Sequence, residues 1–248
     1  MTTPTPNRRS FLKFAGAASA GAVMLGGINM TALAETSVTT KSKQQDIEIL
    51  NYALLLEYLE AEFYLNFSEK GALRSKLTNA RVKQYADQIY AHEKAHVDFL
   101  VKTITDAGEK AIPKPDIDFT PLLTNPDKSP KTINDELFLA LAATFEPIGV
   151  RAYLGQADKI LTAGYLTAAA SVLAVEANHA SGIQELRRQL GYTKADQQTS
   201  IAPQPKGGET VTNTGQFDLN YSPTPTDFWK PLDMKTVSDI VGPLLPKS

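Results

Sequence analysis

The sequence contains no cysteine among its 248 residues. This absence excludes disulfide bonds and thiolate metal sites, including a rubredoxin-type iron centre that could deliver electrons within the same chain. Any redox partner must therefore be external. Histidine is also scarce, with three residues, so a site that contains imidazole must draw on very few positions.

The chain has no excess of positive charge, with 25 Lys and Arg against 27 Asp and Glu. Removal of residues 1–34 on export would take away Arg8, Arg9 and Lys13. The remaining chain would then have 22 basic residues against the same 27 acidic residues. This balance does not favour nucleic acid as a partner. The hydrophobic content of 42% is enough for one domain of about 150 residues with terminal extensions.

The N-terminal residues predict export. The segment Asn7-Arg-Arg-Ser-Phe-Leu-Lys13 is a twin-arginine motif, an Ala- and Gly-rich apolar run covers 14–33, and Ala32-Leu-Ala34 forms a cleavage site. We therefore expect residues 1–34 to be a signal peptide for the twin-arginine export machinery, with cleavage after Ala34 and a periplasmic or extracellular mature protein. The alternative is that the run is retained as a membrane anchor.

Beyond a Ser/Thr/Lys-rich linker at 35–45, the apolar periodicity predicts four helices, over about 46–70, 79–107, 134–161 and 165–190. Asp46 is a candidate N-cap for the first of these helices. The Pro- and Asp-rich connection at 109–132 is long enough to run the length of a bundle, which would make the second and third helices parallel. Residues 192–248 form a polar tail with a short amphipathic stretch at 234–245. We expect its aromatic residues to pack on the bundle, or the tail to mediate oligomerisation.

Glu93 and His96 are three residues apart on the apolar face of the second helix, so a carboxylate and an imidazole point into the core. A buried carboxylate needs a partner or a metal ion. Glu176 and His179 repeat this Glu-x-x-His spacing in the fourth helix. In the first and third helices a lone inward glutamate is followed seven residues later by tyrosine; these pairs are Glu57 with Tyr64 and Glu146 with Tyr153.

Two details qualify this pattern. Glu60 lies only slightly off the face of Glu57 and is the alternative ligand in the first helix, while Pro147 directly follows Glu146 and predicts a kink at that point. His92 points about 100° away from Glu93 around the helix, which predicts a surface or interhelical position.

In both content and order, the pattern resembles the ferritin-like family of dimetal carboxylate four-helix bundles, over residues 46–191. The segment Glu57-Tyr-Leu-Glu-Ala-Glu-Phe-Tyr64, with the export signal and the long tail, is similar to secreted ferritin-like proteins related to plant desiccation-associated proteins. The resemblance implies an all-α bundle with a long crossover between helices two and three. It also implies a centre of two transition-metal ions, iron or manganese, although the ligand types suit zinc as well.

In that family pattern, two glutamates bridge the metal ions and the remaining ligands are divided between them. The resemblance assigns the bridges to Glu93 and Glu176, one ion to Glu57 and His96, and the other ion to Glu146 and His179. Tyr64 and Tyr153 are then hydrogen-bond donors to the ligands or ordinary core aromatics. A buried hydrogen-bonded network without metal is the alternative for all six ligands.

Three functions follow from the resemblance. The first is redox chemistry on dioxygen or peroxide in stress protection, with an external electron donor, as in dimetal oxidases, peroxidases or catalases. The second is metal binding or a structural stress role without turnover, and the third is iron storage.

Overall fold

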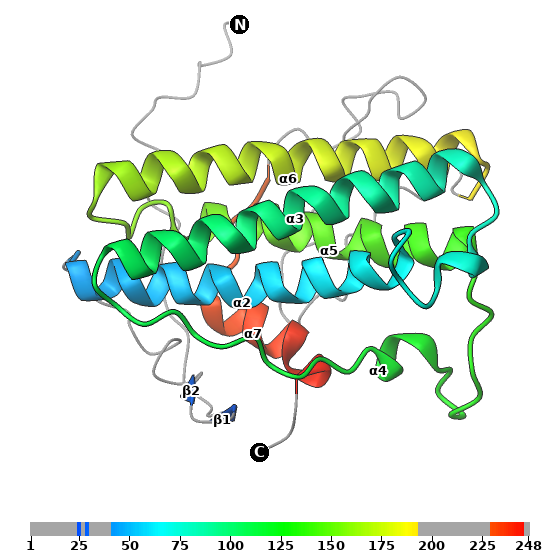
Figure 1. Cartoon of the computed structure of the whole chain (residues 1–248), viewed down its shortest axis with the longest axis horizontal. Coiled ribbons are helices and arrows are strands. Elements are labelled where there is room, and N and C mark those ends of the chain that lie inside the picture. The colour runs from blue at the N-terminus through cyan, green and yellow to red at the C-terminus, as the bar shows by residue number, and fades with distance from the viewer. Residues whose placement is uncertain (1–23, 26–27, 30–40, 193–228, 246–248) are drawn as a thin grey trace, which may run out of the picture.

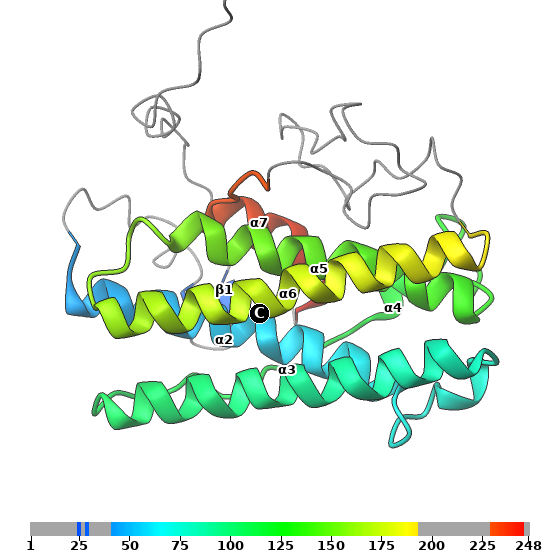
Figure 2. The ribbon, with the colours of Figure 1, turned by 90° about the horizontal axis from the view of Figure 1, so that it is seen from above.

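The computed structural model describes residues 24–25, 28–29, 41–192 and 229–245, and within them the chain forms an all-α bundle. The four long helices are α2 (Lys43–Phe67), α3 (Ala80–Asp106), α5 (Asp135–Gln156) and α6 (Ala163–Gln189). They lie lengthwise beside one another (Figures 1 and 2). The predicted all-α four-helix fold is thereby confirmed. The short elements are β1 (Met24–Leu25), β2 (Ile28–Asn29), η1 (Arg74–Lys76), α4 (Thr120–Leu123), α7 (Met234–Val241) and η3 (Gly242–Leu244).

The start of α2 differs from the sequence prediction. Ser42 caps this helix, because its side chain accepts a hydrogen bond from the backbone of Gln45. Asp46 lies inside the first turn and reaches another helix. Its carboxylate accepts hydrogen bonds from the backbone nitrogens of Leu161 at 2.7 Å and Thr162 at 2.9 Å, at the start of α6. The prediction of Asp46 as the N-cap of its own helix was wrong, because its carboxylate satisfies free N–H groups ahead of α6.

Asp135 in the first turn of α5 makes the equivalent contact at the opposite end of the bundle. It accepts hydrogen bonds from the backbone nitrogens of Thr78 and Asn79, ahead of α3. The two halves of the bundle are therefore related by a pseudo-twofold axis. Adding 89 to a residue number in α2 gives its counterpart in α5, as for Asp46 and Asp135. Adding 83 relates α3 to α6 in the same way.

The connection between α3 and α5 runs the length of the bundle, so these two helices are parallel (Figure 1). The connection is fastened to α2 along its course. Asn51 accepts a hydrogen bond from the backbone of Ile112 at 2.9 Å, and Glu62 forms an ion pair with Lys114. The long crossover predicted from composition is present, and it contains the single-turn helix α4.

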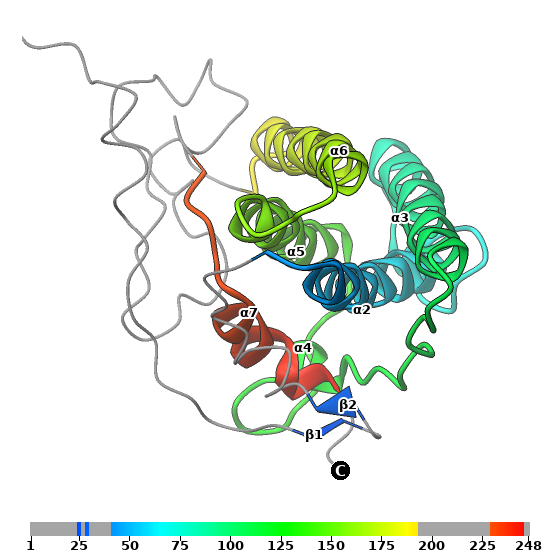
Figure 3. The same ribbon diagram turned by 90° about the vertical axis from the view of Figure 1, so that its left-hand side faces the viewer.

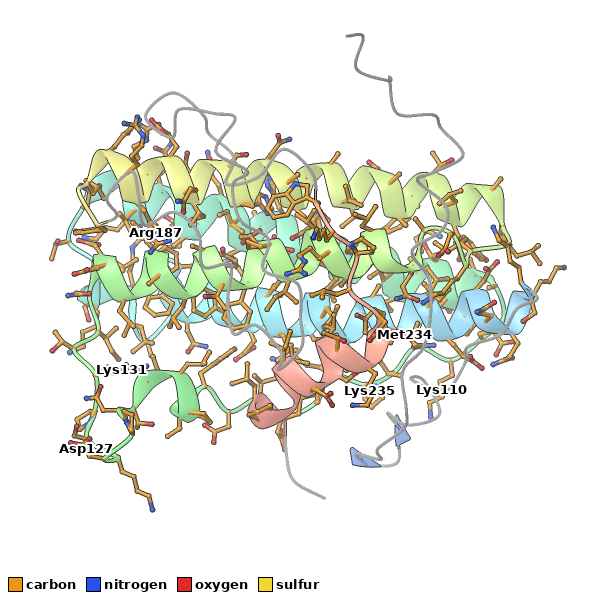
Figure 4. All side chains as sticks on the ribbon, turned by 180° about the vertical axis from the view of Figure 1, so that it is seen from behind. Lys110, Asp127, Lys131, Arg187, Met234 and Lys235 are labelled. Carbon is orange, nitrogen blue, oxygen red and sulfur yellow. The ribbon has the colours of Figure 1, made fainter. Side chains whose placement is uncertain are left out.

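The C-terminal segment packs on the bundle beside α5 and α2 (Figures 3 and 4). The backbone nitrogen of Leu232 donates to the carbonyl of Arg151 at 3.0 Å. This approach requires Gly155, because a Cβ at that position would lie 1.8 Å from the carbonyl oxygen of Leu232. The buried side chains of α7 are Met234, Val237 and Val241. Packing by the described tail is thus mainly aliphatic, with Trp229 half-buried, whereas Phe228 lies outside the described residues.

Helix α5 is apolar enough, over a sufficient length, to cross a membrane, and it is the one such helix in the described part of the chain. The structure accounts for this composition, since 72% of its most apolar stretch is buried inside the protein. The helix also continues through Pro147 without interruption. Its hydrophobicity is therefore that of a core helix.

The contact between Asp46 and α6 generates a stability prediction. Asp46→Ala should lower the free energy of unfolding by about 1.5–3 kcal/mol, because two part-buried N–H groups lose a charged acceptor. Asp158→Ala is the matched control, since Asp158 is exposed in the same connection between α5 and α6. Urea unfolding of both variants checks the prediction, and equal midpoints would contradict it.

Candidate metal centre

All six predicted ligands come together between the four helices, midway along the bundle. Each long helix contributes a glutamate whose side chain is 0% exposed; these are Glu57, Glu93, Glu146 and Glu176. The two histidines of the Glu-x-x-His pairs complete the cluster, and the side chains of His96 and His179 are 12% and 7% exposed. The amphipathic spacing recognised in the sequence therefore directs all six side chains into one buried layer.

The cluster divides into two halves that share two carboxylates. One ligand atom from each of Glu57, Glu93, His96 and Glu176 lies within 4.8 Å of the others, and the same is true of Glu93, Glu146, Glu176 and His179. Glu93 and Glu176 belong to both groups. A carboxylate between two such positions can bridge two ions, which is the arrangement expected for these two glutamates.

Distances to the histidines describe each half. In the first, His96 Nδ1 lies 3.1 Å from both Glu57 Oε2 and Glu93 Oε2. In the second, His179 Nδ1 lies 3.0 Å from Glu93 Oε1 and 3.1 Å from Glu146 Oε2. Each imidazole thus presents Nδ1 to the carboxylates.

The two tyrosines form hydrogen bonds with Glu57 and Glu146, the carboxylates that each belong to only one of the two groups. Tyr153 donates from its hydroxyl to Glu57 Oε1 at 2.5 Å, and Tyr64 donates to Glu146 Oε1. Each tyrosine follows the glutamate of its own helix by seven residues but bonds the glutamate of the partner helix. The repeated seven-residue spacing therefore corresponds to a pair of reciprocal hydrogen bonds, in which the tyrosine of each helix, α2 or α5, bonds the glutamate of the other.

Glu176 provides the test of whether these residues fit a metal ion. Both of its carboxylate oxygens are buried without a hydrogen-bond partner, although Oε1 lies 3.4 Å from His96 Nδ1. Buried acceptors are normally satisfied, and an isolated buried carboxylate is strongly disfavoured. Carboxylate oxygens and imidazole nitrogens are suitable ligands for iron, manganese and zinc. The residues present therefore fit a centre of two metal ions.

Protons carry the compensating charge when no metal is bound. Burial raises the pKa of Glu57 to about 7, against the opposing effect of its hydrogen bond with His96. Burial alone would lower the pKa of His96, but the carboxylates of Glu176, Glu57 and Glu93 outweigh it and raise the value to about 12. The contacts with Glu146 and Glu93 likewise raise the pKa of His179 to about 11. Glu93, which contacts both histidines, has its pKa lowered to about 2 despite burial.

Glu60 is a fifth buried carboxylate at this level, and its side chain is 4% exposed. Burial raises its pKa well above the ordinary value, and the charge of Glu176 adds to the effect. Its counterpart in α5 is Gly149, where a Cβ would lie 2.7 Å from Glu176 Oε2 and 3.3 Å from Glu60 Oε1. The glycine leaves room for both carboxylates. The deviation of Glu60 from the face of Glu57 was visible in the sequence, but the space that accommodates it was not.

His92 contacts the site from outside. Its ring is exposed, as expected for a surface position, yet its Nδ1 lies 2.8 Å from Nε2 of His179. The two rings stack with centroids 5.1 Å apart. Because Nδ1 of His179 faces the carboxylates, His92 holds the other ring nitrogen and thereby orients the ring. The helical angle predicted a surface or interhelical position, and this contact is interhelical, across the gap between α3 and α6. The angle could not identify His179 as the partner.

These pKa values predict a pH dependence for the metal-free protein. Glu57 releases its proton near 7 when folded but near its ordinary value of 4.5 when unfolded, so raising the pH through this window destabilises the fold. His96 and His179 stabilise the fold below their ordinary value of 6.5, and this contribution is lost as the pH rises towards 11 or 12. Both effects lower the stability of the metal-free fold as the pH rises. The melting temperature after chelation should therefore fall between pH 5 and pH 8.

The control is Glu57→Gln, which should make this fall less steep. Protein loaded with metal should show the opposite trend, because protons compete with the metal for the same ligand atoms. A melting temperature of the chelated protein that rises with pH would contradict the assignment.

Comparison with known proteins agrees with the geometry. Residues 5–25 match the model of the twin-arginine translocation pathway signal sequence, and residues 45–189 match the model of the ferritin-like domain. A search of curated proteins finds no match. The ferritin-like match covers more than half of the chain and coincides with the four helices that carry the carboxylates and histidines. This chain therefore belongs to the ferritin-like family.

Proposed function

We propose that this protein is an exported metalloprotein that holds two iron or manganese ions and uses them to reduce dioxygen or peroxide, in a protective role outside the cytoplasm. The observation that supports it is the pair of buried ligand groups that share Glu93 and Glu176. Bound iron or manganese would supply electrons to an oxygen species. The chain's own residues bind and orient the ions, exclude water and provide protons.

The ligand roles follow from membership of the two groups. Glu93 and Glu176 would bridge, Glu57 and His96 would complete one position, and Glu146 and His179 the other. Tyr153 and Tyr64 fix the carboxylates of Glu57 and Glu146 by hydrogen bonds. The layer is buried, so these bonds are stronger than they would be in water.

Charge balance favours a metal that changes oxidation state. Two divalent ions carry four positive charges, which neutralise Glu57, Glu93, Glu146 and Glu176. Glu60 adds a fifth buried carboxyl group to this layer. It can hold a proton while both ions are divalent and release it when one becomes trivalent. Zinc has no redox chemistry in proteins, so a zinc centre would not require Glu60 to release its proton.

Export and metal loading are compatible. The twin-arginine signal matched at residues 5–25 supports delivery to the periplasm or beyond. That pathway carries folded proteins, so metals can be acquired in the cytoplasm before transport. Cleavage after Ala34 is part of the proposal, and this position lies outside the described residues.

Oxygen and peroxide consumption by the metal-loaded protein, with a chemical reductant present, tests turnover directly. Consumption that requires bound metal would support the redox function. Stoichiometric metal binding without any consumption would instead establish the alternative of a metal-binding stress protein.

The sharing of Glu93 and Glu176 predicts a ranking of variants. Glu93→Ala or Glu176→Ala should reduce metal content from near two ions per chain to near none, because each removes a ligand from both positions. Glu57→Ala or Glu146→Ala should lose mainly one ion. Elemental analysis of the purified variants measures this, and equal effects at all four positions would contradict the bridging assignment.

Glu60→Gln is the matched control for that series, because it removes a buried carboxylate of the same layer that lies outside both ligand groups. It should retain both ions. Since the variant cannot release a proton to balance a trivalent ion, its metal reduction potential should be higher than that of the unmodified protein. Redox titration followed by absorbance provides the readout.

Export generates its own prediction. Replacing Arg8 and Arg9 together by lysine should retain the protein in the cytoplasm, because the transport machinery recognises the arginine pair itself. Immunoblots of cytoplasmic and exported fractions check the outcome, and normal appearance of the exported form would contradict it.

A further inference from the structure

A small cavity of about 20 Å³ lies between the four helices near the C-terminal ends of α3 and α5. Its lining includes Ala53, Leu100 and Val172, each four residues from a member of the carboxylate layer on its own helix: Glu57, His96 and Glu176. The cavity is therefore one helical turn from the candidate metal centre. Tyr153 also lines it, and its hydroxyl bonds Glu57, so this ring stands between the cavity and the ligands.

The opposite end of the bundle is filled at the equivalent positions. There Phe63, Phe67 and Phe138 pack together, with Phe63 and Phe138 stacked at 5.7 Å between ring centroids. By the pseudo-twofold relation, their counterparts at the cavity end are Ala152, Gln156 and Ile49, all of which line the cavity. At these three positions the cavity end carries smaller side chains than the phenylalanines of the opposite end, which leaves space beside the site.

The cavity approaches the surface between α3 and α6. Phe99 on α3 lines it and is 43% exposed, and the facing Ala168 and Ala169 on α6 are half-buried. Its walls are aliphatic and aromatic apart from the tyrosine hydroxyls and Gln156. Its volume admits one or two molecules the size of water. A small apolar molecule loses no hydrogen bonds in such a space, whereas peroxide could replace its bonds to water only at the tyrosine hydroxyls and Gln156.

We propose that this cavity is the binding and entry site for dioxygen, which reaches the carboxylate layer from the end where α3 and α5 terminate. The inference rests on the proposed redox function and selects dioxygen over peroxide as the substrate at this entrance. The competing occupant is an ordered water molecule. Tyr52 Oη and Gln156 Nε2 belong to lining residues, are buried and have no hydrogen-bond partner, so water could bridge them.

Xenon is a suitable probe, because it occupies small apolar cavities irrespective of metal content. Crystals of the full mature protein pressurised with xenon should show the atom beside Tyr153 and Ala152. Ala168→Leu should displace it by filling the entrance, while Ala170→Leu, an exposed position on the same helix, should not. Density for a water between Tyr52 and Gln156, with no xenon, would overturn the proposal.

The kinetic arm uses the same variants. Protein loaded with ferrous ions is mixed with dioxygen, and the rate constant for oxidation is measured at equal metal content. Ala168→Leu should slow oxidation about tenfold, equivalent to about 1.4 kcal/mol, and Ala170→Leu should leave it unchanged. Xenon binding with an unaltered rate in Ala168→Leu would overturn the entry role.

The two arms separate this inference from the proposed function. Absence of metal binding would defeat the proposed function while xenon still reports on the cavity. Metal-dependent dioxygen consumption with no xenon in the cavity and no effect of Ala168→Leu would defeat the cavity proposal alone.

Discussion

Five carboxylates buried at one level of a helical bundle cannot all remain ionised without positive charge beside them. In this protein that charge comes from protons on His96 and His179 when metal is absent, and would come from two cations when metal is bound. The reciprocal hydrogen bonds from Tyr64 and Tyr153 and the space provided by Gly149 serve the same layer. Both the stability of the bundle and the candidate metal site therefore depend on how the charge of these buried carboxylates is balanced.

The pseudo-twofold relation extends beyond the ligands, because Asp46 and Asp135 accept hydrogen bonds from corresponding N–H groups at the two ends of the bundle. The two halves differ at several positions near the site. Glu60 has Gly149 as its counterpart, and His92, which contacts His179, has Val175. The filled end with Phe63 and Phe67 faces an end with Ala152 and Gln156. Each exception makes the two candidate metal positions, or the two approaches to them, chemically different.

The crossover between α3 and α5 and the C-terminal tail form an outer layer on the bundle, and their contacts fasten it to α2 and α5. The crossover is fastened to α2 through Asn51, and its Asp118 donates a backbone hydrogen bond to the carbonyl of Leu244 in the tail. The tail in turn pairs with Arg151 on α5, one turn beyond Pro147. These segments cover the faces of α2 and α5, whose residues are buried around most of the helix circumference.

The sequence alone determined the helices, their order and the six carboxylate and imidazole side chains that meet in the core, because periodicity and the Glu-x-x-His spacing are local properties of a helix. It also indicated export, which depends on a linear motif. Only the tertiary structure decided which partner each group meets. Asp46 binds the start of α6 instead of capping its own helix, His92 contacts His179 across two helices, and Glu60 enters the layer because Gly149 lies opposite. These outcomes depend on the spacing and rotation of neighbouring helices, which no periodicity within one helix encodes.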